Sequence, residues 1–218
     1  MYGFKKNKIK MAEYQVKSLF IGENPTVSVK GLPPKLHASR RRLPKNLAAF
    51  LQWNPRDGFK YEWENNQLIK LSEMLTPEQF HIVKNLTRLF ATTEAYTNGD
   101  ELQPEVKAQT TATRVRVPDI AYISKAQQVE MVLGKAPVPR FVVEIISKTD
   151  EHWETDSKLE EYLQAGVEVV WQILPYSEKI YVYTSLEDIK VCRGATLCSA
   201  ESVIEGFSIA AKAVFEKP

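Results

Sequence analysis

The chain has 218 residues, of which 44% are hydrophobic and 26% are charged, and its formal net charge is only +2. This length allows one substantial hydrophobic core plus an appendage, and the small net charge gives no global argument for nucleic-acid binding. No apolar run reaches the roughly 18 residues of a membrane span, and two cysteines make no disulfide framework, so we expect a cytoplasmic protein with reduced thiols.

Basic residues gather near the start of the chain. Lysines cluster among residues 5–10, and Arg40, Arg41 and Arg42 form a second group. Prolines interrupt residues 1–45 and the apolar residues there have no regular period, which predicts a basic, partly extended N-terminal arm. A solvated arm is the simpler interpretation, and phosphate contacts by the three arginines are the alternative. Residues 46–218 are predicted to form a single domain.

The first elements of this domain are short. Residues 45–53 favour a helix that buries Leu47, Phe50 and Leu51. Residues 60–63 and 67–71 favour two strands joined by a tight turn at the intervening polar residues. Thr76, Pro77 and Gln79 are typical of a helix start, and the helix should run to about residue 91. Its expected buried stripe is Phe80, Val83, Leu86 and Phe90.

The second half of the domain alternates strands and helices. Residues 95–112 suit extended edge structure, residues 120–123 a strand, and residues 124–138 a loop with a helical turn. The run from Arg140 to Ser147 is a buried strand, residues 158–163 lie in a helix that stops at Gly166, and residues 168–174 form another buried strand. Strand, helix and strand make a βαβ unit with parallel strands, followed by an antiparallel strand at 179–184. The pattern predicts an α/β fold with a mixed sheet.

Glu144 is the one charge inside the buried run RFVVEIIS. Burying an ionised carboxylate without a partner costs several kcal/mol, so Glu144 must be paired, protonated or bound to a metal. Side chains alternate along a strand, which places Glu144 on one face with Val142 and Ile146. Since Ile146 stands where a lysine of the same strand would be its neighbour, a partner lysine must come from elsewhere, and Lys158 in the following helix is the candidate.

Two further acids, Glu62 and Asp119, occupy strand-like positions. Carboxylates from adjacent strands can converge on Mg²⁺ or Mn²⁺, which activates water and stabilises phosphoryl charge. Glu62, Asp119 and Glu144 are therefore the candidate acids of such a site, and Lys158 is the candidate lysine. Lys148 is a rival lysine at the strand end, and a purely structural Glu144–Lys158 ion pair is the simpler alternative.

The order of these motifs resembles the Uma2-like (DUF820) family of the restriction-endonuclease-like PD-(D/E)XK superfamily. The resemblance spans roughly residues 45–215. The matching positions are Tyr61-Glu62, His81, Arg116-Val117-Pro118-Asp119-Ile120-Ala121, Val142-Val143-Glu144-Ile145-Ile146-Ser147, Asp156, Lys158, Tyr162, Gly166-Val167, Val170-Trp171, Gly206-Phe207-Ser208-Ile209 and Phe215.

The resemblance implies a restriction-endonuclease-like core, in which a central mixed β-sheet is flanked by helices. It implies metal binding by Asp119 and Glu144, with Lys158 as the catalytic lysine and Glu62 as an additional acid. Residues lining the site would be Arg116, Ser147, Tyr162 and His81.

The function implied is that of a Mg²⁺- or Mn²⁺-dependent endonuclease acting on DNA, with a homodimer expected by resemblance alone. Two alternatives stay open: an inactive nuclease-like fold that binds nucleic acid or protein, and a hydrolase for another phosphoester. No recognition helix or zinc finger identifies a target sequence.

Overall fold

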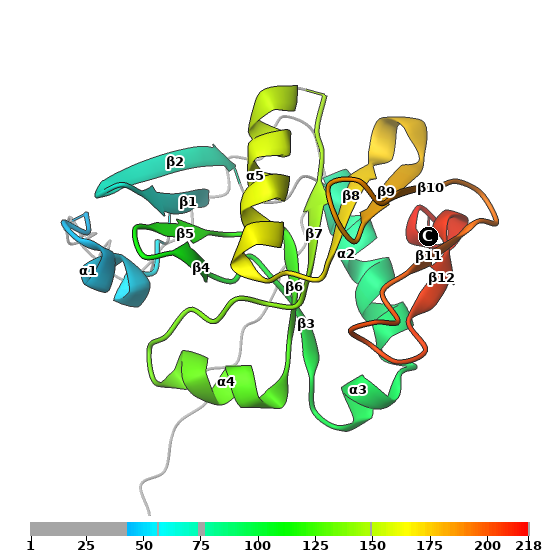
Figure 1. The fold of residues 1–218 in the computed structure, drawn as a ribbon, viewed down its shortest axis with the longest axis horizontal. Helices are drawn as coiled ribbons and strands as arrows, with labels where there is room; N and C mark the ends of the chain where they lie inside the picture. Colours follow the sequence, from blue (N-terminus) through cyan, green and yellow to red (C-terminus); the bar gives the residue numbers. More distant parts are fainter. Residues whose placement is uncertain (1–42, 56, 74–76, 149, 218) are drawn as a thin grey trace, which may run out of the picture. The chain divides into compact units, whose positions relative to one another are not determined.

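A six-stranded mixed sheet forms the centre of the computed structural model, which describes residues 43–55, 57–73, 77–148 and 150–217. The strand order is β10-β9-β8-β7-β6-β3. Strands β7 and β8 are parallel, and the other neighbouring strands are antiparallel. The strands are β3 (Glu101–Pro104), β6 (Ile120–Ile123), β7 (Phe141–Ile145), β8 (Val169–Leu174), β9 (Lys179–Tyr183) and β10 (Ile189–Cys192) (Figure 1).

The predicted βαβ unit is confirmed as β7, α5 (His152–Ala165) and β8. Gly166 ends α5 with a positive φ of 102°, a backbone conformation that glycine adopts without strain. The predicted antiparallel strand after β8 is also confirmed, as β9. The parallel register places Glu144 opposite Gln172, so the acid lies in the middle of the sheet.

The two faces of the large sheet bury different side chains. On one face, alternate residues of β7 such as Val143 pack with α2 (Pro77–Phe90) and the C-terminal segment. On the other face, Val142 packs with Leu159 and Tyr162 of α5. Alternation along β7 therefore turns Glu144 toward α5, as the sequence predicts.

The predicted buried stripe of α2 is partly wrong. Leu86 and Phe90 are buried, together with Ile82, but Phe80 is 59% exposed. With 3.6 residues per turn, Phe80 lies about 120° around the helix from Leu86, whereas Ile82 and Phe90 lie about 40° from it. The buried face is therefore centred on Leu86 and excludes Phe80.

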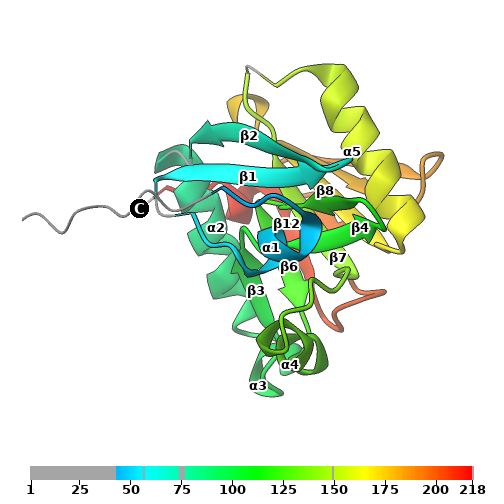
Figure 2. The ribbon, with the colours of Figure 1, turned by 90° about the vertical axis from the view of Figure 1, so that its left-hand side faces the viewer.

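A second, antiparallel sheet has the order β2-β1-β5-β4. Its hairpin turns at Asn65 and Asn66, whose positive φ values of 47° and 66° suit a tight two-residue turn between strands. Helix α1 (Leu47–Gln52) lies beside this sheet and buries Phe50 against Trp63 (Figure 2). The strands are β1 (Phe59–Glu64), β2 (Gln67–Glu73), β4 (Ala108–Thr111) and β5 (Arg114–Arg116).

Several shorter elements complete the described chain. The expected loop after residue 124 contains a full helix, α4 (Lys125–Val132), because Ser124 and Gln127 form a capping box that stabilises its start. The others are α3 (Glu94–Thr97), the 3₁₀ turn η1 (Pro175–Ser177), β11 (Leu197–Ser199), β12 (Ser208–Ala210) and α6 (Ala211–Val214).

Some predictions fall on residues outside the described part of the chain. These are residues 1–42 of the N-terminal arm, which include Arg40, Arg41 and Arg42, and the helix cap at Thr76. Across the described residues, no helix is long and apolar enough to cross a membrane. Cys192 and Cys198 are buried free thiols, which agrees with the expectation that they form no disulfide.

Candidate active site

Charged side chains from both sheets and from α5 meet in one buried cluster. Figure 1 shows α5 between the smaller sheet and strands β7 and β8. The buried charged residues there are Glu62, Arg116, Asp119, Glu144 and Glu161. The cluster divides into two parts that differ in how their carboxylates are neutralised.

The first part, which we call the arginine half, consists of Glu62, Arg116 and Glu161. Arg116 donates from Nη1 to Glu62 Oε2 at 2.9 Å and from Nη2 and Nε to Glu161 Oε2 at 2.7 and 3.0 Å. Glu62 is 1% exposed and also accepts the backbone N–H of Val117 at 3.2 Å. Every carboxylate in this half therefore has a cation and several donors.

Lys158 joins the arginine half rather than forming an ion pair with Glu144. Its Nζ lies 3.3 Å from Glu62 Oε1. Burial disfavours the Lys158 ammonium, but Glu144 and Glu62 outweigh burial and raise its pKa. Burial likewise opposes the Glu62 carboxylate, yet Lys158 and Arg116 lower its pKa below the ordinary value. Lys158 therefore stays charged beside the acids.

The second part, which we call the carboxylate half, contains Asp119, which directly precedes β6, and Glu144 of the neighbouring strand β7. Asp119 Oδ1 accepts from Lys60 Nζ at 2.8 Å, and Oδ2 accepts the backbone N–H of Ile145 at 2.7 Å. The bond to Ile145 fixes the Asp119 carboxylate directly beside Glu144. Burial opposes the Lys60 ammonium, but Asp119 and Glu144 raise its pKa.

Glu144 is neutralised less completely than the other acids. It is 8% exposed and accepts from the hydroxyl of Tyr162 at 2.6 Å. Among the described residues it has no ion pair and no second hydrogen bond. Burial raises its pKa, Lys158 and Lys60 oppose that rise, and Asp119 adds to it, so the net pKa is raised. Glu144 is thus the acid that would gain most from an added cation.

The structure brings together Glu62, Asp119, Glu144 and Lys158, and adds two of the predicted lining residues, Arg116 and Tyr162. It does not bring in His81, which is half-buried on α2 and, within the described residues, has no hydrogen bond or ion pair with the cluster. Ser147 follows β7, and its backbone N–H donates to Asp150 Oδ2 at 2.7 Å.

Two members of the cluster, Lys60 and Glu161, were missed by reasoning from the sequence. Lys60 could have been found from the alternation in β1, where Lys60, Glu62 and Glu64 occupy every second position between aromatic residues. Glu161 lies three residues after Lys158 and therefore on the same face of α5. The spacing from Lys158 could therefore have identified Glu161 as a member of the cluster. It could not have identified Arg116 as the partner of Glu161.

The donors available suit a hard divalent cation held by two protein carboxylates. Among the described residues, no group of three or more His, Cys, Asp or Glu side chains is arranged to hold a metal. Mg²⁺ often binds through one or two carboxylates and keeps several waters, so Asp119 and Glu144 are a sufficient set. Lys60 forms an ion pair with Asp119, so its ammonium would compete with such an ion for the Asp119 carboxylate.

Comparison with known proteins agrees with this fold. A family model described as "Uma2: Putative restriction endonuclease" matches residues 47–212, and the chain belongs to this family. A solved structure described as a "putative nuclease belonging to DUF820" from Anabaena variabilis ATCC 29413 aligns with a TM-score of 0.64 and 17% identity, over 79% of this chain and 98% of that one. A search of curated proteins finds no match to the chain. The family and the mixed-sheet, nuclease-like fold expected from the sequence are confirmed.

Proposed function

We propose that the protein is a divalent-metal-dependent endonuclease that hydrolyses phosphodiester bonds in DNA. The observation that carries this proposal is the carboxylate half. There Asp119, at the start of β6, lies beside Glu144 of the adjacent strand β7, both acids are buried, and Glu144 has no ion pair among the described residues. A buried acid left in this state lowers the stability of the fold. Such groups are concentrated at functional sites. Membership in the family described as "Putative restriction endonuclease" supports the same conclusion.

Each residue of the cluster has a defined part in this proposal. Asp119 and Glu144 would hold Mg²⁺ or Mn²⁺, which when bound supplies activation of water and stabilisation of phosphoryl charge. Tyr162 donates to Glu144 and thereby orients its carboxylate. Lys60 and Lys158 place positive charge where a phosphate would approach.

The arginine half supports these groups mechanically. Arg116 links Glu62 of β1 to Glu161 of α5, so it joins the smaller sheet to the helix that covers Glu144. Lys158 on α5 bonds to the same Glu62. These bonds hold Tyr162 and Lys158 at fixed positions over the carboxylate half.

The test is cleavage of supercoiled plasmid DNA by the purified full-length chain with Mn²⁺ or Mg²⁺. We expect nicked or linear products with metal, none with EDTA, and none from Glu144→Gln or Asp119→Asn. Equal cleavage by Glu144→Gln and the unmodified chain would disprove the assignment. DNA binding without cleavage would instead support the alternative of a non-catalytic binding module.

A further inference from the structure

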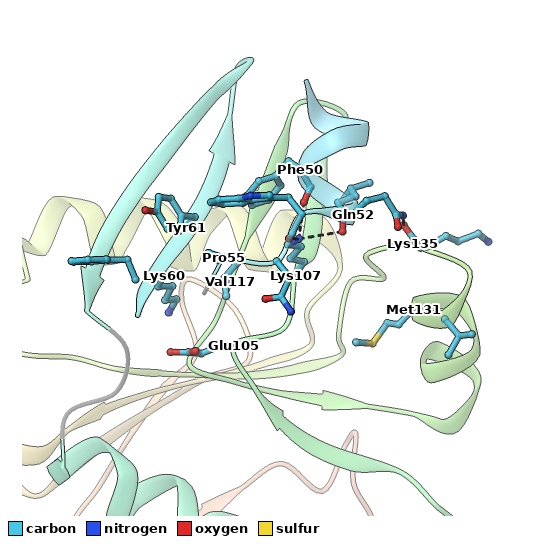
Figure 3. A pocket seen from close by; sticks show the side chains of 16 residues that line it. Phe50, Gln52, Pro55, Lys60, Tyr61, Glu105, Lys107, Val117, Met131 and Lys135 are labelled. Atoms are coloured by element: carbon cyan, nitrogen blue, oxygen red, sulfur yellow. Dashed lines mark hydrogen bonds between the residues drawn. The ribbon is translucent and has the colours of Figure 1, made fainter. Parts of the chain in front are cut away.

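A cavity of about 420 Å³ opens beside the charge cluster. Its walls come from α1 and the segment after it, from β1, from the turn between β3 and β4, and from α4 (Figure 3). Ligand pockets in proteins have volumes of roughly 300–1,000 Å³, so this cavity is large enough for a small molecule or one residue of a polymer. Neither the family description nor the proposed chemistry assigns it an occupant.

Residues that line the cavity also contact the acids of the cluster. Lys60 lines the cavity, and its Nζ bonds to Asp119. Glu105 also lines it, and its backbone N–H donates to the carbonyl oxygen of Asp119 at 3.3 Å. Val117, a third lining residue, donates its N–H to Glu62. A molecule in the cavity would therefore be separated from Asp119 by one residue, Lys60, which contacts both.

One wall of the cavity is aromatic. The rings of Trp53 and Tyr61 meet edge to face with centroids 4.9 Å apart, and Phe50 lies next to Trp53 at 6.3 Å. Lys107 holds this wall in place by donating to the carbonyls of Phe50, at 2.6 Å, and Leu51, at 3.1 Å, and to that of Trp53; these bonds appear as dashed lines in Figure 3. Planar nucleobases stack on aromatic side chains irrespective of their sequence.

The charged groups that line the cavity are mainly positive. The lining includes one acid, Glu105, and three lysines, Lys60, Lys107 and Lys135. Burial lowers the pKa of Lys107 to about 8, which leaves it predominantly an ammonium at neutral pH. The lining charges favour an anionic ligand, which would compete with the partners that two of these lysines already have, Asp119 for Lys60 and Glu130 for Lys135.

Two lining side chains carry polar atoms without partners. Trp53 Nε1 and Glu105 Oε1 are both buried and form no hydrogen bond within the described part of the chain. Glu105 also has a positive φ of 53°, which is uncommon for a residue with a side chain and occurs often at functional sites. A donor and an acceptor that line the same cavity would gain partners if each turned toward a ligand that carries both kinds of group, as every nucleobase does.

We propose that this cavity binds a single unstacked nucleotide, with its base against Trp53 and Tyr61 and its phosphate toward the lysines. The inference rests on the proposed nuclease function and adds to it a preference for DNA with an unpaired nucleotide beside the bond to be cut. A free nucleotide has the same chemistry and is the other source of such a ligand.

The experiment is calorimetric titration of the full-length chain, in EDTA, with dAMP, with a DNA duplex containing one bulged nucleotide, and with the same duplex fully paired. We expect dAMP to bind and the bulged duplex to bind more tightly than the paired one. Trp53→Ala should weaken dAMP binding by roughly tenfold or more, because it removes a stacking surface, and should abolish the advantage of the bulge.

Charge reversal provides a second, independent variant. Lys135 is exposed and lines the cavity, so Lys135→Glu should fold normally and weaken dAMP binding severalfold. Lys190→Glu, which makes the same charge change on exposed β10 away from the cavity, is the matched control and should bind as the unmodified chain does. If Trp53→Ala does not fold, Lys135→Glu against Lys190→Glu decides the question.

The outcomes separate this inference from the proposed function. Binding of dAMP without an advantage for the bulge supports the cavity as a site for free nucleotides. Loss of dAMP binding in the cavity variants, with no cleavage by the unmodified chain, supports the cavity and contradicts the nuclease. Metal-dependent cleavage, with dAMP and bulge binding equal in Trp53→Ala, Lys135→Glu and the unmodified chain, overturns the nucleotide site and leaves the nuclease standing.

Discussion

The arginine half and the carboxylate half of the buried cluster contain the same kinds of acid in different surroundings. Glu62 and Glu161 share the guanidinium of Arg116 and have lowered pKa values despite burial. Glu144 is similarly buried but receives one hydrogen bond, from Tyr162, and its pKa is raised. Because Glu62, Glu161 and Glu144 are all buried, the difference between their pKa shifts comes from the groups that pair with each acid and not from its depth in the protein.

The comparison indicates a division of labour. A fully paired buried network costs little once formed and is destabilising to break, which suits a structural role. An acid with too few partners reduces stability, and such groups concentrate where function requires them. Substitutions in the two halves should therefore have opposite consequences for activity and for stability.

The largest effect is expected on catalysis. Glu144→Gln should reduce metal-dependent cleavage by more than about a hundredfold, because metal-ion catalysis contributes several kcal/mol to transition-state stabilisation. The measurement is the initial rate of plasmid nicking at saturating Mn²⁺. Glu161→Gln, assayed at a temperature where it is folded, should stay within about tenfold of the unmodified rate.

The next effect is on stability. Glu161→Gln should lower the free energy of unfolding by about 3 kcal/mol, since removing one partner of a buried ion pair costs 3–5 kcal/mol and Glu62 remains to pair with Arg116. Urea denaturation measures it. Glu168→Gln is the matched control, because Glu168 pairs with Arg140 at the surface with 43% of its side chain exposed, and it should lose less than about 1 kcal/mol. Equal losses in the two variants would contradict the structural role of the arginine half.

A smaller effect is expected from the hydroxyl that orients Glu144. Tyr162→Phe removes the 2.6 Å hydrogen bond and should cost about 1 kcal/mol of stability while slowing cleavage severalfold. Tyr122→Phe removes a comparable bond, which Tyr122 of β6 donates to Asp100 just before β3, and serves as the control. Its stability should fall by a similar amount with no change in the cleavage rate.

The smallest effect concerns pH. The raised pKa of Glu144 means that the folded chain holds this proton at pH values where the unfolded chain has released it. Stability from protonated Glu144 is complete below its unfolded pKa and is lost as pH rises through the folded value. In EDTA, thermal melting should therefore show Glu144→Gln gaining stability relative to the unmodified chain as pH rises from 4 toward 8. A constant difference across this range would show that Glu144 is not destabilised by ionisation.

Local patterns account for most of what could be predicted from the sequence. The βαβ unit followed from a buried run, a helix stop at Gly166 and a second buried run, each of which depends on neighbouring residues. The face of Glu144 followed from strand alternation. Phe80 was misplaced because its spacing from Val83 fits a helical stripe whose centre the sequence alone does not define.

Contacts between distant segments could not be predicted in the same way. Lys60 and Asp119 are 59 positions apart, and Arg116 and Glu161 are 45 apart. Their pairing depends on how the smaller sheet packs against α5, which no local spacing encodes. For the same reason Lys158 was expected beside Glu144, whereas its ion pair is with Glu62.

Calorimetric titration with Mn²⁺ tests the central claim, that the carboxylate half is the part of the cluster built to receive a cation. The account predicts that the unmodified chain binds Mn²⁺, that Glu144→Gln and Asp119→Asn lose this binding, and that Glu161→Gln retains it. Absence of Mn²⁺ binding to the unmodified chain, or unchanged binding in Glu144→Gln, would contradict it.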